Sequence, residues 1–429
     1  MLVFLSDVHL TDGSSGTTVD PRAFNKFCQI LKNIVGDAKK SNIKTIEIIL
    51  LGDILDLIRS DFWLRPENEG LPHPVRPWSA ASDVDRSGWN LQQYTEAIVD
   101  KIINNQRNIE AIGYLKGFQT HCVDADIQIS YLIGNHDWLI NRYPSTRQKV
   151  ADFFGMRGAQ FYAQNQFPYD RVFQDYKVMA RHGDYYDPIN YEGNRDASSL
   201  GDAIVIDLLT RFPQAIRNDP VLGLDNALVN QFKEIDNVRP LLDIPAWIQD
   251  ICNYRHGIER KVHDIWNDLV SKFFKIKFVQ DHDRFGPDMI DFLEMALKLS
   301  SGFSFDKLKK ILGNRVVESL SQQFDNYEKF AYREAPLKNN TVSYVVYGHT
   351  HTVAQVPLGI VSAPPNFTSE KIYFNTGTWR KIFKHTAFDS ENCEFIGWHV
   401  MTFVLFYLEE EKERDRNYEV WSASLGYGR

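Results

Sequence analysis

The first third of the chain alternates short apolar runs with longer stretches of helical period. Three of the apolar runs are rich in β-branched residues and have the length of buried strands: Leu2–Leu5, Thr45–Leu51 and Ile127–Ile133. Pro21–Lys40 predicts a helix with Asp20 as its N-cap, and Leu91–Thr120 predicts another. The order strand, helix, strand predicts an α/β fold with largely parallel strands and helices on the outside.

Apolar runs return near the C-terminal end. Further strands are expected at Tyr176–Ala180, Val342–Tyr347, Lys371–Phe374, Glu394–Glu409 and Tyr418–Ser422. The last two predict a hairpin across the charged segment Glu410–Asn417.

Two regions depart from this alternation. Ser60–Asn90 is rich in proline and glycine, has no clear period, and carries the aromatic residues Phe62, Trp63, Trp78 and Trp89. A loop of this length in a compact domain is usually functional or disordered. Its aromatic residues fit a loop that faces a substrate and a loop packed on the core about equally well.

The second region, from about Asn190 to Ala335, has mostly helical period. Examples are Asp202–Thr210, Ala246–Phe274 and Asp288–Lys298. We expect a helical insertion, or cap, of residues 191–335 between two parts of a core, residues 1–190 and 336–429.

Five short motifs each follow a predicted strand. They are Asp7-Val8-His9, Gly52-Asp53, Gly134-Asn135-His136-Asp137, His182-Gly183-Asp184 and Gly348-His349-Thr350-His351. Functional side chains in open α/β sheets gather at the carboxyl ends of the strands. Carboxylate, amide and imidazole groups in this mixture suit Mn²⁺, Zn²⁺ or Fe better than Ca²⁺. The motifs therefore predict a site with enough ligands for two divalent ions.

Composition narrows the class of protein. The 429 residues are 43% hydrophobic and 13% aromatic, as expected for a globular enzyme. The net charge is −8, and residues 190–335 contain 19 basic and 23 acidic residues, so nucleic acid is possible as a substrate but not favoured.

The four cysteines are far apart in sequence, which argues against a cysteine-based zinc site or a disulfide framework. The chain starts directly with a strand, and its most apolar late stretch, Val400–Leu408, is too short to span a bilayer. We expect a soluble, cytoplasmic protein without a signal peptide or membrane span. The pattern does not predict its oligomeric state.

The order D-x-H, G-D-x-x-D, G-N-H-D, H-G-D, G-H-T-H resembles the calcineurin-like metallophosphoesterase superfamily. The resemblance covers roughly residues 1–190 and 336–380 and implies a β-sandwich flanked by helices. It implies one metal ion held by Asp7, His9, Asp53 and His351, and a second held by Asp53, Asn135, His182 and His349. Mn²⁺ is the first choice, with Zn²⁺, Fe or Mg²⁺ as alternatives.

The chemistry implied is hydrolysis of a phosphodiester, phosphomonoester or pyrophosphate bond. Two ions about 3.5–4 Å apart bind the phosphate oxygens and lower the pKa of a bridging water, which attacks as a hydroxide. His136 has no metal role in this scheme and suits a proton donor to the leaving oxygen.

Three carboxylates near the motifs have two readings. Asp56, Asp137 and Asp184 each either orient an imidazole by accepting its second N–H or satisfy turn backbone.

Three further residues have weaker signals. Arg181 and Arg380 are candidate phosphate clamps, although a surface ion pair places an arginine equally well. Asn375 opens the segment Asn375–Trp379, which is similar to a segment beside the metal histidines in the superfamily, and we expect it to support the site.

The superfamily hosts many substrates, so the fold does not choose one. The motif style is closest to the UDP-diacylglucosamine hydrolase-like branch. The chain departs from that branch at His136, where arginine is usual, and in its large insertion. A nucleotide or nucleotide-linked phosphoester is the first expectation.

Two alternatives remain open. A DNA-repair-type nuclease would need a basic groove for single strands, with Lys272, Lys275, Lys277, Lys307, Lys309 and Lys310 as the only hints. A non-catalytic, metal-stabilised scaffold that binds partners through its insertion would be expected to have lost catalytic positions, yet all are present.

Overall fold

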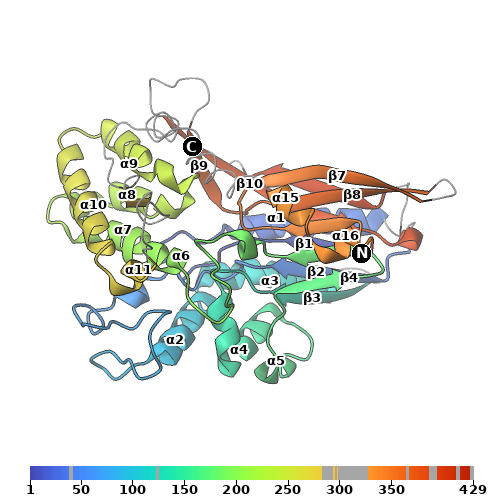
Figure 1. The fold of residues 1–429 in the computed structure, drawn as a ribbon, viewed down its shortest axis with the longest axis horizontal. Helices are drawn as coiled ribbons and strands as arrows, with labels where there is room; N and C mark the ends of the chain where they lie inside the picture. Colours follow the sequence, from blue (N-terminus) through green and yellow to red (C-terminus); the bar gives the residue numbers. More distant parts are fainter. Residues whose placement is uncertain are drawn as a thin grey trace.

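The computed structural model describes residues 1–37, 42–121, 125–282, 293, 294, 297, 327–363, 367–385, 394–411 and 416–425. Within this part of the chain, two mixed β-sheets and several helices form a mixed α/β fold (Figure 1). The predicted α/β class is therefore confirmed.

The first sheet has the strand order β11 (Tyr418–Ser424), β10 (Phe395–Phe406), β1 (Leu2–Leu5), β2 (Thr45–Leu51) and β3 (Asp126–Leu132), and β9 (Lys381–His385) pairs with β10. Strands β1, β2 and β3 are parallel, as predicted, while β10 runs antiparallel to β1 and β11.

The second sheet has the order β4 (Asp170–Phe173), β5 (Val178–Arg181), β6 (Tyr344–Tyr347), β8 (Phe367–Thr376) and β7 (Val353–Ala363). Strands β5, β6 and β8 are parallel, and β4 and β7 are antiparallel edge strands. The sequence pattern missed β4, β7 and β9. In β7, Pro357 and Gly359 flank a register shift, which disturbs the period of two that marks a strand.

The two sheets pack face to face because successive side chains of a strand point to opposite faces. Leu2 and Phe4 of β1 belong to an apolar cluster shared with Val346 and Phe374 of the second sheet. Val3 and Leu5 belong instead to the cluster that contains the helices on the outer face.

The helices that follow β1, β2 and β3 cover this outer face. They are α1 (Pro21–Asp37), α2 (Leu91–Ile103), α3 (Gln106–His121), α4 (Pro144–Phe154) and the short α5 (Phe161–Gln164). Asp20 accepts a hydrogen bond from the backbone N–H of Arg22 with its side chain, as expected of a cap. The predicted helix Leu91–Thr120 is two helices, because α2 ends at Ile103 with Asn104 as its C-cap.

A run of helices lies between β5 and β6. It contains α6 (Leu200–Ala203), a π-helical turn η5 (Ile204–Thr210), α7 (Arg211–Asn218), α8 (Asn226–Phe232), α9 (Ile244–Asn253), α10 (Glu259–Phe273) and α11 (Lys277–Gln280). Figure 1 shows α7 to α10, in green to yellow, gathered on the opposite side of the molecule from the β7–β8 hairpin. We call residues 200–282 the helical segment.

The predicted helix Ala246–Phe274 is interrupted. Gly257, between α9 and α10, has φ +79°, which a helix does not allow. The predicted helix Asp288–Lys298 lies largely outside the described residues, and so do Lys307, Lys309 and Lys310. The proposed boundaries at residues 190 and 336 stay a prediction.

Shorter elements complete the described chain. Helices α15 (Tyr327–Ala331) and α16 (Ala335–Lys338) pack on the outer face of the second sheet. Single 3₁₀ turns are η2 (Asp61–Leu64), η3 (Trp138–Arg142), η4 (Asp184–Tyr186), η6 (Leu222–Leu224), η7 (Ile235–Asn237), η8 (Leu241–Asp243) and η9 (Glu409–Glu411). Among the described helices, none is long and apolar enough to cross a membrane.

Candidate metal centre

The five predicted motifs meet at one edge of the two sheets. They follow the carboxyl ends of β1, β2 and β3 in the first sheet and of β5 and β6 in the second. Within each sheet these strands are parallel, so their carboxyl ends share one edge. Segments up to 342 residues apart thereby come into contact, as between Asp7 and the backbone N–H of His349.

One group of ligand atoms belongs to Asp7, His9 and His351. The Nε2 atoms of the two histidines are 3.1 Å apart, and Asp7 Oδ1 lies 3.3 Å from His351 Nε2 and 4.0 Å from His9 Nε2. All three residues are buried. Their ligand atoms lie close enough together to hold a metal ion.

A second group belongs to Asp53, His182 and His349, which could hold a second ion. His182 Nε2 lies 3.0 Å from Asp53 Oδ2, and Asn135 Oδ1 lies 3.0 Å from His349 Nδ1. Asp7 Oδ1 is also 4.0 Å from His182 Nε2, which joins the two groups. All seven predicted ligands therefore lie in one buried cluster, which we call the ligand cluster.

The tautomers of two histidines fit metal binding. His9 Nδ1 lies 3.0 Å from a carboxylate oxygen of Asp56, and His182 Nδ1 lies 2.9 Å from the carbonyl oxygen of Leu51. Both partners only accept hydrogen bonds, so each Nδ1 carries the proton in a neutral ring. The lone pair is then on Nε2, the atom that faces the ligand cluster, as in metal-binding histidines with an oriented second nitrogen.

The backbone at the ligand cluster is strained. Eight non-glycine residues in the described chain have positive φ, and five of them are predicted ligands: Asp7, His9, Asp53, His349 and His351, with φ between 50° and 69°. This conformation costs on the order of 1–3 kcal/mol per residue and persists only where surrounding structure imposes it. Such concentration of strain is typical of a functional site.

Two glycines of the motifs allow the close approach. A Cβ on Gly52 would lie 2.5 Å from His182 Nδ1, and a Cβ on Gly134 would lie 2.7 Å from the backbone nitrogen of Asp53. Neither contact is possible for a real Cβ. The glycines in G-D and G-N-H-D are therefore required by packing against ligands, which the sequence does not show.

Asp56 orients imidazoles, one of its two predicted readings. Its carboxylate lies 3.0 Å from His9 Nδ1 and 2.8 Å from His136 Nδ1, and it accepts the backbone N–H of Arg59 at 3.1 Å. Its side chain is completely buried. His9, Asp56 and His136 also form a third group that could hold an ion.

Asp137 satisfies turn backbone, which is the other predicted role. It accepts hydrogen bonds from the backbone N–H groups of Gly134 and Ile54 and from the hydroxyl of Tyr131. Burial and the nearby charge of Asp53 raise its pKa to about 7. Asp137 thus holds the backbone of two motifs in place and makes no hydrogen bond to an imidazole among the described residues.

Asp184 and Arg181 have partners outside the ligand cluster. Asp184 pairs with Arg195. Arg181 pairs with Glu334 at 3.1 Å and Asp170 at 3.4 Å, so ion pairs hold this arginine in place, as in the alternative to a phosphate clamp. Neither residue contacts a predicted ligand in these interactions.

Asn375 supports the last motif. Its side-chain amide donates to the carbonyl oxygen of Gly348 at 2.7 Å, and its Oδ1 accepts the backbone N–H of Gly377. It ties the end of β8 to the loop that carries His349 and His351, as expected.

Asp187, which contacts His349, was not among the residues selected from the sequence. Asp187 Oδ2 lies 3.0 Å from His349 Nε2 and also accepts a hydrogen bond from the side chain of Asn190. Asn190 Oδ1 in turn accepts from the amide of Asn135. The position of Asp187 five residues after His182 was the only available signal, and it matches no motif.

The helical segment reaches the ligand cluster through Arg239. Arg239 Nη2 lies 3.1 Å from His351 Nδ1. Its backbone N–H donates to the carbonyl oxygen of Phe383 in β9, which anchors this part of the helical segment on the first sheet. A guanidinium only donates, so this contact places the proton of a neutral His351 on Nε2, opposite to His9 and His182.

Burial and neighbouring charges shift the pKa values of groups in the ligand cluster in different directions. Burial opposes ionisation of Asp53, but His182 and His136 outweigh it and lower the pKa of Asp53. Burial likewise opposes protonation of His136, yet Asp56 and Asp53 raise its pKa to about 10. Burial lowers the pKa of His351 well below its usual value, and Arg239 adds to this. Burial also opposes protonation of His182, but Asp53 and Asp7 outweigh it and raise the pKa of His182 well above its usual value. His136 and His182 are thus the two histidines suited to hold a proton at neutral pH, and of these only His136 is outside the predicted ligand set.

The aromatic loop Ser60–Asn90 packs on the protein. Trp63 is fully buried and donates to the carbonyl of Leu57, while Trp78 stacks on Phe278 of α11 at 4.4 Å between ring centroids. Trp63 therefore follows the packed-loop alternative, whereas Trp78 packs on Phe278 and also lines a pocket.

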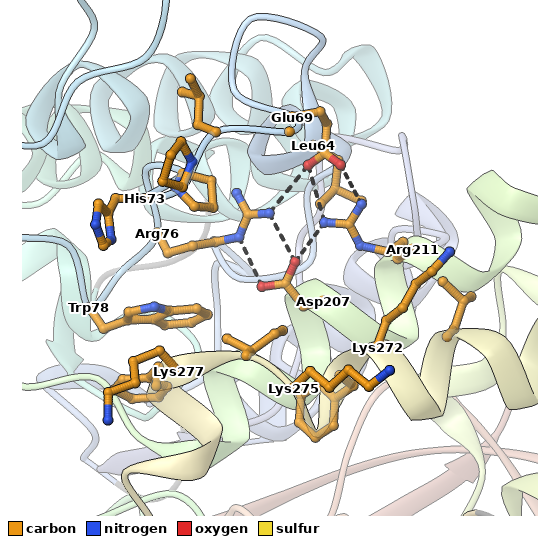
Figure 2. Close-up of a pocket in the computed structure, with 18 of the residues that line it drawn as sticks. Leu64, Glu69, His73, Arg76, Trp78, Asp207, Arg211, Lys272, Lys275 and Lys277 are labelled. Atoms are coloured by element: carbon orange, nitrogen blue, oxygen red, sulfur yellow. Dashed lines mark hydrogen bonds and ion pairs between the residues drawn. The ribbon is translucent and has the colours of Figure 1, made fainter.

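A pocket of about 1390 Å³ lies between this loop and the helical segment (Figure 2). In Figure 2, Arg76 and Arg211 each form ion pairs with both Asp207 and Glu69. These charges compensate one another. The pocket shares no lining residue with the ligand cluster.

Comparison with known proteins adds no relative. No protein-family model matches the chain, and no curated protein matches it significantly.

Proposed function

We propose that this protein is a binuclear metal-dependent phosphoesterase of the calcineurin-like type, with a sandwich core and the helical segment as its cap. The observation that carries the proposal is the convergence of seven oxygen and imidazole ligands, five of them on strained backbone, at the shared edge of parallel strands. Two ions would be held by Asp7, His9 and His351 and by Asp53, Asn135, His182 and His349, with Asp53 as the bridge.

The metals, Mn²⁺ in the first place, would neutralise charge on the phosphate oxygens and activate the attacking water. The residues of the chain position the rest. Asp56 fixes the ring of His136 through Nδ1, so a protonated His136 donates from Nε2 to the leaving oxygen. The near-complete burial of the ligands excludes bulk water, which strengthens each electrostatic interaction.

A variant of His136 tests whether this residue is a proton donor or a metal ligand. His136→Gln should retain two metal ions and lose turnover by about 10²–10⁴-fold. If metal stoichiometry falls instead, His136 is a ligand, as the third possible group allows.

The direct test uses protein loaded with Mn²⁺ and para-nitrophenyl phosphate or its bis-aryl diester. Wild type should release nitrophenol, and Asp53→Asn should abolish the reaction because it removes the bridging charge. Asp170→Asn is the matched control, since Asp170 is a half-exposed carboxylate on β4 whose ion-pair partner is Arg181, outside the ligand cluster. Two bound ions without hydrolysis of any phosphoester would refute the proposal.

The substrate class proposed is a nucleotide or nucleotide-linked phosphoester. A panel of a mononucleotide, a cyclic dinucleotide, a dinucleoside polyphosphate, a UDP-sugar and single-stranded DNA tests it, and cleavage of the DNA alone would favour the nuclease alternative.

A further inference from the structure

Three arginines crowd against one side of the ligand cluster. Arg59 follows β2, Arg380 follows β8, and Arg239 belongs to the helical segment. Arg380 Nη1 lies 3.0 Å from Asp236 and 3.5 Å from Asp56, and Arg239 contacts His351.

Carboxylates face these arginines at several points. Asp236 and Asp56 are the two carboxylates within ion-pair distance of Arg380, and Asp56 is shared with His9 and His136. Burial lowers the pKa of Arg59; Asp236 opposes this, and Arg380 adds to it. Asp56 and Glu234 also face Arg59, and Asp7 and Asp53 also face Arg239. A further anion would therefore be bound through unused hydrogen-bond donors rather than through an excess of positive charge.

Two of the guanidinium groups have unused donors. Arg59 is fully buried and Arg380 is 4% exposed. Arg59 uses Nη2 to donate to the carbonyl oxygens of Ser15 and Lys233, and Arg380 uses Nη1 for its carboxylates. Arg59 Nε and Nη1 and Arg380 Nε and Nη2 have no hydrogen-bond partner among the described residues.

The unused atoms of Arg380 form the edge that binds oxyanions. Nε and Nη2 lie on the same side of a guanidinium, and their parallel N–H groups match two oxygens of a phosphate or carboxylate. Buried N–H donors without acceptors cost about 1–3 kcal/mol each, so an acceptor at this edge would relieve a real cost.

Gly16 marks where such an acceptor would fit. A Cβ built on Gly16 would lie 3.2 Å from Arg59 Cγ, 3.3 Å from Arg59 Nε and 3.7 Å from Arg380 Nη2. Unused donors from two arginines therefore flank residue 16, and an acceptor binds there when these flexible side chains move apart. We call Arg59, Arg380 and Gly16 the arginine cradle.

We propose that the arginine cradle is an oxyanion subsite that binds a second phosphate group of the substrate, beside the one hydrolysed at the metal centre. The position follows from Asp56, which contacts Arg380 on one side and the rings of His9 and His136 on the other. The inference rests on the proposed phosphoesterase function and specifies its substrate as a molecule with two phosphates.

The test compares matched substrates with one and two phosphates. Mn²⁺-loaded protein is given the bisphosphates of ethylene glycol, propanediol and butanediol, and ethyl, propyl and butyl phosphate. Wild type should hydrolyse at least one bisphosphate with a kcat/KM about 10- to 100-fold above that of its monophosphate, the range of one or two charge-assisted hydrogen bonds.

Gly16→Ala fills the cradle without changing a charge. The three atoms nearest to the added methyl group belong to the flexible side chains of the two arginines, which would shift by a few tenths of an ångström. Gly16 is not among the residues with positive φ. The preference for the bisphosphate should fall by about tenfold or more in Gly16→Ala and in Arg380→Gln. Gly113→Ala, in α3 with open space around its Cβ, is the matched control and should keep the preference.

A binding measurement separates this inference from the proposed function. Ethylphosphonate and the ethylene-bridged diphosphonate, which resist hydrolysis, are titrated calorimetrically onto the Mn²⁺-loaded protein. If no phosphoester is hydrolysed but Gly16→Ala selectively weakens the diphosphonate, the subsite stands and the function fails. If phosphoesters are hydrolysed but wild type prefers no bisphosphate, or Gly16→Ala leaves the preference intact, the subsite is refuted. Binding of free phosphate at the cradle without a bisphosphate preference also refutes it.

Discussion

Asp56→Asn should weaken metal binding although Asp56 is not itself among the seven predicted ligands. In wild type the carboxylate accepts the Nδ1–H of His9 at 3.0 Å and so keeps the lone pair of His9 on Nε2. It also accepts from His136 at 2.8 Å. Asparagine keeps one acceptor oxygen, so one of the two imidazoles must face an N–H₂ group or lose its partner.

The magnitude follows from the contacts that change. A hydrogen bond to a charged group contributes about 1.5–3 kcal/mol, and a buried group left without its partner costs a similar amount. About 1.4 kcal/mol corresponds to a tenfold change in an equilibrium constant. The free-energy loss therefore matches the roughly 10- to 100-fold loss of metal affinity that is typical when a residue that orients a ligand is changed. We expect a loss in this range and a lower kcat, because His136 is no longer fixed.

The assay is a competition titration of chelator-stripped protein with Mn²⁺. Asp137→Asn is the control: Asp137 is as deeply buried, but it accepts from backbone N–H groups and a tyrosine hydroxyl rather than from an imidazole. Its metal affinity should stay within about threefold of wild type, well below the 10- to 100-fold change of a ligand-orienting residue. Thermal unfolding of both variants shows that the comparison is between folded proteins. If Asp56→Asn binds Mn²⁺ as tightly as wild type, the argument that Asp56 sets the tautomer of His9 is wrong.

Two further predictions address the helical segment. Arg239→Gln should tighten metal binding by up to about tenfold. A glutamine oxygen can accept the Nδ1–H of His351 and leave the lone pair on Nε2, whereas a guanidinium cannot accept a hydrogen bond. If a metal titration shows weaker binding, Arg239 supports the ligand instead. Burial raises the pKa of Asp202 to about 6, so the folded state holds this proton more tightly than the unfolded chain. The contribution of the protonated carboxyl to the free energy of unfolding is present below about pH 4 and is lost as the pH rises through 6. Asp202→Asn should therefore be more stable than wild type by about 3 kcal/mol at pH 8 and no more stable at pH 4, as urea unfolding at both values would show; an equal difference at both would refute the buried-charge explanation.

The sequence by itself determined the local parts of this protein. The apolar runs at β1, β2 and β3 predict buried parallel strands because a strand covered on both faces needs apolar side chains at every position. Ligand-type residues directly after strands predict a shared site because the carboxyl ends of parallel strands lie at one edge. Both inferences use only neighbours in sequence, and for this reason the clustering of the seven ligands was predictable.

The tertiary structure decided which of several equivalent local readings applies. Asp56 and Asp137 look alike in sequence, yet one contacts two imidazoles and the other contacts backbone. Asp187 matches no motif and was found only through its contact with His349.

Contacts between distant segments account for the rest. Arg59 and Arg380 are 321 positions apart in sequence. They meet at Gly16 only because β2, β8 and the loop after β1 end at the same edge. Arg239 reaches His351 because the helical segment is anchored on β9. Such pairings depend on how the sheets and the helical segment pack, and no local pattern of hydrophobic and polar residues encodes them.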